Sequence, residues 1–277
     1  MVAFAANSLL NRAALIDGDS GPAIFALVRV ASGAVALAFL ASLSGQGIRI
    51  LSWCRLWPAL ALVLYLLGFS MAYVELDAGL GALILFGGVQ VTMFAGALIG
   101  GNRPPGRRWV GMGIGLAGLA LLLWPVEGAE FALRGTLMMV AAAIGWGIYS
   151  LLGRGSTMPL ADTAASFLCA TPFVLFFWIA SGEGAAISSR ALLLAMISGA
   201  LTSGLGYAVW YSVLPRLEAS IAGLAQLTVP VIAVIGGTTL LSEDLGLRTI
   251  IAGGVVLCGV AFGIIAPSGR SVPADRR

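Results

Sequence analysis

The stretch GFSMAY, from Gly68 to Tyr73, returns in altered form as GYAVWY, from Gly206 to Tyr211. The two stretches share the first glycine, an aromatic second residue and the final tyrosine, and half of the 277-residue chain separates them. Two later segments also align, namely VGMGIGLAGLALLLWP, which ends at Pro125, and AGGVVLCGVAFGIIAP, which ends at Pro267. This pattern predicts one structural unit that occurs twice.

The composition is that of an integral membrane protein. Hydrophobic residues make up 60% of the chain and charged residues 10%, with a mean hydropathy of +1.02. A soluble domain would carry about 25% charged residues. The apolar runs approach the roughly 20 residues that a helix needs to cross a bilayer. We therefore expect an all-α protein with ten membrane spans, at 1–16, 23–43, 57–74, 80–100, 109–126, 135–153, 161–181, 191–214, 218–241 and 246–267.

The repeat assigns five spans to each unit, so residues 1–126 form the first unit and 135–267 the second, followed by a tail at 268–277. Because five is odd, the second unit must enter the membrane from the opposite side, as an inverted repeat. Such a pair can present an outward-open and a nearly mirrored inward-open state, which is the physical basis of alternating access.

The distribution of arginine predicts the orientation, since all fifteen basic residues are arginines. With both termini in the cytoplasm, ten arginines fall in inner loops and the tail and three in outer loops, which is a strong positive-inside bias. We therefore expect a multi-pass protein of the plasma (inner) membrane with cytoplasmic termini.

Several chemistries are excluded or disfavoured by the residues present. The chain has no histidine, so a Ser-His-Asp triad and an HExxH zinc site are impossible. No carboxylate lies in the middle of a span, and no Walker A motif is present. We expect neither an enzyme nor direct ATP coupling, and we assign no cofactor, no metal and no nucleic-acid partner.

One segment carries a family resemblance, from Gly204 to Gly254. It contains the run Gly-Tyr-x-x-Trp-Tyr at 206–211, the EASIA turn, Pro230 within a span and Glu243 after it. These features resemble the second repeat of an EamA-type transporter, of the drug/metabolite transporter superfamily, and the first half of the chain is similar but looser. The resemblance implies ten helices in two inverted repeats and export of small organic solutes. One departure is the stretch IGGNRPPG after the fourth span, where the family often has an acidic residue.

Polar residues in the middle of spans are the candidates for a solute pathway, because each costs free energy in the membrane. Pro230 leaves the carbonyl of Gln226 without its helical partner, and that carbonyl, the Gln226 amide and the Thr228 hydroxyl lie within one turn. Gln90 and Thr92 hold similar positions in the first unit and are expected to face the same cavity. The alternatives are a simple proline bend and ordinary interhelical hydrogen bonds.

Aromatic residues form a second candidate group, with Tyr207, Trp210 and Tyr211 in one unit and Phe69 and Tyr73 in the other. Tyr207 and Tyr211 are four positions apart and share a helix face. They either line the pathway or anchor span ends at the membrane interface.

Charged and amide groups of the first two spans complete the list. Arg29 lies about 10 Å into its span at 1.5 Å per residue. It either snorkels to the outer surface, pairs with carbonyls or an acidic loop residue, or meets an anionic substrate. Arg12, nearer a span end, is expected to snorkel to the surface. Asn7 and Asn11 place two amides on one face of the first span, facing either Arg29 or the pathway.

These residues predict a secondary transporter that exports a small metabolite or drug-like solute, with an amino-acid-like solute as first choice. The alternative is a channel-like or lipid-handling membrane protein. Since no carboxylate lies in mid-span, we expect facilitated diffusion or exchange, or coupling through Glu243, a possible gate, at a span mouth. The partners are a small-molecule substrate and the lipid bilayer. Glycine stripes such as GMGIGLAG, from Gly111 to Gly118, favour internal packing of a monomer but also permit a homodimer.

Overall fold

A computed structural model describes residues 1–48, 56–101, 104–124, 132–213, 216 and 219–265. Each predicted span corresponds to helical structure within this part of the chain. The elements are α1 (Val2–Leu15), α2 (Pro22–Leu43), α3 (Leu56–Ala72), α4 (Ala78–Ile99), α5 (Gly106–Leu123), α6 (Leu133–Gly153), α7 (Pro159–Ser181), α8 (Ser189–Ile197), the π-helix η2 (Ser198–Leu205), α9 (Gly206–Val213), α10 (Ala219–Leu240) and α11 (Leu247–Ile264). The predicted tail at 268–277 lies outside the described residues.

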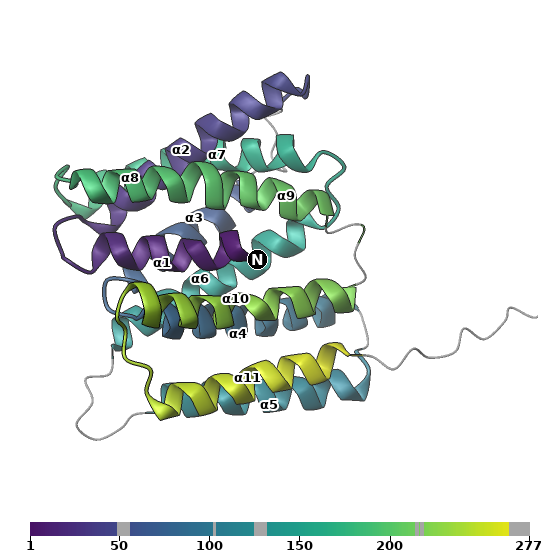
Figure 1. The fold of residues 1–277 in the computed structure, drawn as a ribbon. Helices are drawn as coiled ribbons and strands as arrows, with labels where there is room; N and C mark the ends of the chain where they lie inside the picture. Colours follow the sequence, from purple (N-terminus) through teal and green to yellow (C-terminus); the bar gives the residue numbers. More distant parts are fainter. Residues whose placement is uncertain (49–55, 102–103, 125–131, 214–215, 217–218, 266–277) are drawn as a thin grey trace, which may run out of the picture.

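The helices run roughly along one direction, so their termini collect at two ends of the bundle (Figure 1). We call one the Arg154 end; it holds the start of α1 and the last residues of α2, α4, α6, α9 and α11. We call the other the Glu243 end; it holds the last residues of α1, α3, α5, α7 and α10. These two names are used below.

Six of the described helical segments are long and apolar enough to cross a membrane: α2, α4, α6, α7, the combined α8–η2–α9 rod and α11. Two shorter apolar stretches, Leu56–Ala72 and Ala225–Leu240, add to them. Large apolar side chains such as Phe176 and Ile99 face outward, at 72% and 88% exposure. An apolar exterior of this kind suits lipid rather than water. The protein is an all-α, multi-pass membrane protein.

Three helices of the first predicted unit pack against the helices that hold the same place in the second unit. Helix α2 packs along α7, α4 against α10, and α5 along α11, the last two pairs being seen in front-to-back arrangement in Figure 1. Helix α1 packs against α8 and η2, and α3 against α6. Most of the helix contacts in the bundle therefore join the two halves of the chain.

The glycine stripe of α5 serves the α5–α11 contact. A methyl group at Gly111 would lie 2.6 Å from the carbonyl oxygen of Gly259, and one at Gly118 would lie 2.7 Å from the amide nitrogen of Val256. Only glycine permits two helix backbones to come this close. The predicted internal packing role of this stripe is confirmed for these two positions.

Candidate solute pathway

A cavity of about 480 Å³ lies between α4, α5, α6, α9, α10 and α11, in the part of the bundle toward the Arg154 end. Glycines and apolar side chains make up most of its wall, together with a few polar groups. A mostly apolar hollow of this size with a few convergent polar groups is typical of a small-molecule site. It reaches the Arg154 end, where Pro104, Arg108 and Arg154 contribute to the wall.

Three predicted pathway residues, Gln90, Trp210 and Gln226, line this cavity. They come from α4, α9 and α10, so the structure brings both predicted halves to one hollow. Pro230, one turn beyond Gln226 on the same helix, is buried. The expectation that Gln90 and Gln226 face a common cavity agrees with these positions.

Two predicted residues lie elsewhere. Thr228 is exposed, and its hydroxyl donates to the carbonyl of Ala225 in its own helix at 2.7 Å. Thr92 donates to the Gly88 carbonyl at 2.9 Å, and neither threonine belongs to the cavity wall. The reason is geometric: residues two positions apart on an α-helix are rotated by about 200°. When Gln90 and Gln226 face the cavity, Thr92 and Thr228 must face away from it.

The sequence interpretation missed three polar residues of the wall, which are Ser150, Arg108 and Arg154. The two arginines were counted as loop charges that set the membrane orientation. Both arginines lie at span ends, as several other arginines do, so their place in the sequence does not single them out.

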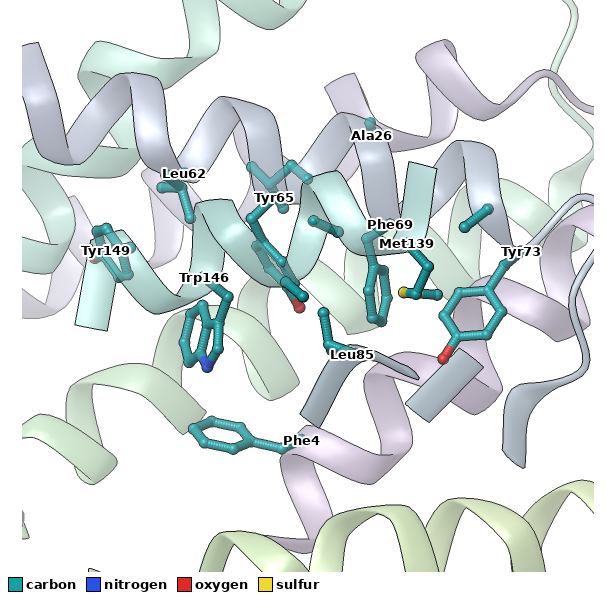
Figure 2. Close-up of a cluster of buried hydrophobic side chains, with 14 of the residues drawn as sticks. Phe4, Ala26, Leu62, Tyr65, Phe69, Tyr73, Leu85, Met139, Trp146 and Tyr149 are labelled. Atoms are coloured by element: carbon teal, nitrogen blue, oxygen red, sulfur yellow. The ribbon is translucent and has the colours of Figure 1, made fainter. Parts of the chain in front are cut away.

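A layer of aromatic rings separates the cavity from the interior beyond it. Phe4 of α1 contacts Trp210, Tyr207 and Trp146 edge-on, at ring-centroid distances of 6.0, 5.5 and 5.7 Å. Trp146 in turn packs against Tyr207 at 4.7 Å and Tyr65 at 5.1 Å. We call Phe4, Tyr65, Trp146, Tyr207 and Trp210 the ring layer. Figure 2 shows Phe4, Tyr65 and Trp146 converging from separate helices.

The remaining predicted aromatics are buried but do not line the cavity. Tyr211 packs edge-on against Tyr149 at 5.9 Å, near the Arg154 end. Tyr73 directly follows the last residue of α3, at the Glu243 end. Its ring is edge-on to Phe69 at 4.7 Å, and its hydroxyl donates to the Ala78 carbonyl at 3.4 Å (Figure 2). The prediction of a lining is therefore supported by the position of Trp210, while Tyr207 lies within the ring layer.

Behind the ring layer lies a buried polar network that centres on Arg29 and Asn7. The Oδ1 atom of Asn7 accepts hydrogen bonds from Ser198 at 2.8 Å, Thr202 at 2.6 Å and Ser203 at 3.1 Å. The Ser203 hydroxyl also accepts from Nε of Arg29 at 3.0 Å. Asn7 and Arg29 are thus joined through one serine, and neither snorkelling of Arg29 nor exposure of Asn7 is observed, since both are at most 1% exposed.

Asn11 continues this network toward the Glu243 end. Its Nδ2 donates to the backbone carbonyl of Asn7 at 3.0 Å, and its Oδ1 accepts from Ser70 of α3 at 2.9 Å. The side chain is completely buried. Asn11 therefore closes the contact between α1 and α3 rather than facing the cavity.

At the Glu243 end, Arg12 joins three elements. Its guanidinium donates to the carbonyls of Tyr73 and Val74 at 3.2 and 3.1 Å and forms an ion pair with Asp77 at 3.2 Å. Its Nε lies 3.6 Å from Oε1 of Glu243. The expectation that Arg12 snorkels to the surface is wrong, because protein oxygens compensate its charge.

The Glu243 carboxylate is held tightly at this end. Oε1 accepts from the Ala78 amide at 2.8 Å, at the first turn of α4, and the side chain is 8% exposed. A methyl group at Gly237 would collide with Oε2. Burial raises the pKa of Glu243 above its ordinary value; the charge of Asp77 adds to this, while the amides of Ala78 and Gly79 and the charge of Arg12 act against it.

Two other glutamates make the same type of contact at the Glu243 end. Glu183, after α7, accepts from the amides of Ala23 and Ile24 at 3.1 and 2.8 Å, at the start of α2. Glu75, after α3, accepts from the Gly135 amide at 2.8 Å, at the start of α6. Carboxylates at helix N-termini satisfy free amides and complement the helix dipole. Each of the three glutamates joins one half of the chain to the other.

The sequence of this chain is similar to that of several known membrane transporters and of one uncharacterized protein. The profile of the EamA-like transporter family matches residues 133–265. An uncharacterized protein of Pseudomonas aeruginosa is 44% identical over 273 residues, which cover 96% of this chain and 92% of that protein. A probable amino-acid metabolite efflux pump of Escherichia coli is 26% identical over 184 residues, or 61% of this chain and 62% of the pump. The uncharacterized transporter YoaV of Bacillus subtilis is 26% identical over 52% of this chain and 51% of its own length.

A solved protein crystal structure has the same fold, with a TM-score of 0.69 over 95% of both chains at 19% identity. At this identity the likeness concerns the arrangement of the helices alone. It agrees with the all-α bundle described above.

Proposed function

Because this chain belongs to the EamA-like transporter family and is a membrane transporter, we propose that it is a secondary carrier that exports a small, amino-acid-like solute by alternating access. The observation that carries the proposal is the asymmetry of access. The cavity of about 480 Å³ reaches the Arg154 end, whereas ion pairs and helix caps close the Glu243 end. A carrier open to one side of the membrane has this form.

The packing of the helices supports the inverted repeat that alternating access needs. Contacts between α2 and α7, α4 and α10, and α5 and α11 each join a helix to its expected counterpart, as helices near a two-fold axis would do. The match of the family profile to residues 133–265 coincides with the predicted second unit, 135–267. We propose that residues 1–126 form the first unit.

The arginine distribution supports an orientation with the Arg154 end in the cytoplasm. Arg107, Arg108, Arg154 and Arg216 lie at this end, while the acidic caps lie at the other. By the positive-inside rule, the cavity of the described state then opens toward the cytoplasm. An exporter in this state is ready to load its solute.

We propose that Gln90, Gln226 and Trp210 contact the solute, because they are the predicted pathway residues whose side chains reach the cavity. The name of the Escherichia coli relative, an amino-acid metabolite efflux pump, supports the choice of an amino-acid-like solute. Amides hydrogen-bond both the amino and the carboxyl group of such a solute, and an indole ring packs against its side chain.

We propose that Glu243 acts as a gate and that its ion pair with Arg12 must break when the Glu243 end opens. In support, Glu243 contacts α4 and Arg12 of the first half although it belongs to the second half. It also lies at a span mouth, and its pKa is raised while this end is closed, so opening is linked to release of its proton.

The test is counterflow in proteoliposomes that contain the full-length chain. Radiolabelled amino acids, nucleobases and sugars are offered one at a time to vesicles preloaded with the unlabelled solute. We expect saturable, competable exchange of at least one amino acid, reduced at least about tenfold by Gln226→Ala or Trp210→Ala. Flux that does not saturate and shows no counterflow would favour the channel-like alternative and overturn the carrier.

A further inference from the structure

Arg29 is completely buried in α2, and the partners of its guanidinium are neutral. Nε donates to the Ser203 hydroxyl at 3.0 Å, and Nη2 donates to the hydroxyls of Tyr65 and Tyr207 at 3.1 and 3.3 Å. Tyr65 belongs to α3, Ser203 to η2 and Tyr207 to α9. Both halves of the chain therefore contribute to the shell around this cation.

Aromatic rings cover the guanidinium as well. Its central carbon lies 4.9 Å from the ring centroid of Phe69 and 5.4 Å from that of Tyr65. Such contacts favour a cation over a neutral group. They do not supply the full negative charge that would balance a guanidinium in the middle of a membrane protein.

One nitrogen of Arg29 lacks a partner. Nη1 is buried without a hydrogen bond, and within the described part of the chain no carboxylate forms an ion pair with this residue. An unpaired charge in a low-dielectric interior costs several kcal/mol, and an ionisable residue inside a membrane protein marks a functional site by default. The missing component is an anion.

The position of Arg29 is next to the cavity, with the ring layer between them. Trp210 lines the cavity and contacts Phe4, Phe4 contacts Tyr207, and Tyr207 accepts from Arg29. A void of about 10 Å³ lies within the ring layer, bounded by Phe4, Tyr207 and neighbouring side chains. This is room for about one water, so a solute reaches Arg29 only when the rings part.

The charges of the cavity wall have the same sign. Arg108 and Arg154 are the charged residues that line it, and the wall within the described residues includes no carboxylate. A wall with this charge raises the local concentration of anions and lowers that of cations. A solute that carries a carboxylate is thus favoured from the entrance to the interior.

We infer that Arg29 is the counter-ion of the solute: in the occluded step of transport, a carboxylate of the solute binds at Nη1 of Arg29. This inference rests on the proposed carrier function and names the group that the carrier recognises. An amino acid qualifies through its carboxylate, whereas its amide and the corresponding amine do not. Ser203, Tyr65 and Tyr207 hold the guanidinium in place, and binding of the anion completes its set of partners.

The experiment compares L-phenylalanine with three analogues that each change one group: 3-phenylpropanoate lacks the amino group, L-phenylalaninamide has an amide in place of the carboxylate, and phenethylamine lacks the carboxylate. Each is tested for counterflow in proteoliposomes and for inhibition of the exchange of whichever amino acid the wild-type chain exchanges best. We expect the two carboxylates to compete at least about thirtyfold better than the amide and the amine, as for a buried charge pair. In Arg29→Gln this preference is lost, and in Arg29→Lys it is partly retained, because lysine keeps the charge but not the planar fork.

Two controls separate recognition from folding. Arg190→Gln removes another arginine, exposed and paired with Asp17 at the Glu243 end, and is expected to transport as the wild type does. Elution as a single species and the unfolding temperature in detergent report whether Arg29→Gln folds. If Arg29→Gln does not fold, the inference is tested by how strongly the wild type and Arg29→Lys prefer the carboxylate solutes over the amide and the amine.

The outcomes are distinguishable from those that test the carrier itself. Saturable exchange in which the amide or amine competes as well as the carboxylates overturns the role of Arg29 and leaves the carrier standing. A folded Arg29→Gln that keeps the wild-type preference also overturns it. A wild-type chain that exchanges no solute of either panel overturns the carrier and this inference together.

Discussion

The carboxylate of Glu243 accepts a hydrogen bond from the backbone amide of Ala78 at 2.8 Å, although 165 positions separate the two residues in the chain. This bond joins the end of α10 to the start of α4, and Arg12 of α1 lies 3.6 Å from the same oxygen. One side chain of the second half thus contacts two helices of the first half. Its protonation state therefore bears on whether this end of the bundle stays closed.

The first prediction concerns pH. Burial raises the pKa of Glu243 while the Glu243 end is closed, and hydration in an open state would return that pKa toward about 4.3. The closed state therefore binds the proton more tightly, and protonation stabilises it relative to the open state. Transport should slow as the pH falls through the raised pKa of Glu243. Glu243→Gln, which is always neutral, should abolish that dependence. Exchange rates measured between pH 4.5 and 8 test this.

The neighbouring Asp244 supplies the control, since its side chain is exposed. Asp244→Asn should keep the wild-type pH profile. A Glu243→Gln variant whose rate still falls with acidification would show that another group is responsible.

The second prediction concerns the cap on α2. Glu183 accepts hydrogen bonds from the amides of Ala23 and Ile24, and removal of a side-chain cap costs about 0.5–2 kcal/mol. Glu183→Ala should therefore lower the free energy of unfolding by about 1 kcal/mol, whereas Glu183→Gln, which keeps one acceptor oxygen, should lose less. Thermal unfolding in detergent measures both. Equal unfolding temperatures for Glu183→Ala and the wild type would contradict the prediction.

The third prediction concerns the contact between α2 and η2. A methyl group at Gly199 would overlap the backbone oxygen of Arg29 and the Ser32 hydroxyl. Gly199→Ala must push η2 away from α2, and overpacking of this kind costs about 1–3 kcal/mol. We expect a lower unfolding temperature and loss of exchange, because Ser203 and Tyr207 would move away from Arg29.

Gly113 provides the matched substitution. It lies in α5, and a methyl group there would meet no atom within 4 Å. Gly113→Ala should be neutral or slightly stabilising, since alanine has a higher helix propensity than glycine. If Gly199→Ala and Gly113→Ala unfold at the same temperature, the close approach at Gly199 does not contribute to the stability of the contact between α2 and η2.

The fold was predictable to the extent that local sequence determines it. Apolar runs of the right length predicted the bounds of the helical segments to within a few residues, because a membrane helix must satisfy its backbone hydrogen bonds internally. The faces of the helices were predicted less well. Gln226 lines the cavity and Thr228 does not, because two residues that are two positions apart on a helix point to opposite sides of it.

The rest of the site depends on contacts between distant parts of the chain. Glu75 and Glu183 looked like ordinary loop charges, and nothing near them in sequence indicates the helix whose amides they accept from. Tyr65 and Trp146 lay unremarked within apolar runs until the structure brought them to Phe4. Arg29 was recognised by its depth, but its lack of an anionic partner only emerges from the three-dimensional arrangement.

The π-helix between α8 and α9 makes the two halves unequal. In the second half, η2 interrupts the rod from Ser189 to Val213, whereas its counterpart α3 is a regular α-helix over Leu56–Ala72. The Ser203 hydroxyl, which accepts from Nε of Arg29 at 3.0 Å, belongs to this wider helical turn, and α3 has no corresponding turn. In the alternating-access cycle proposed above, the two conformations exchange the roles of unlike halves and therefore differ in energy. The empty carrier would therefore favour the conformation that opens to one side of the membrane. Solute binding would have to shift an equilibrium that already favours that conformation.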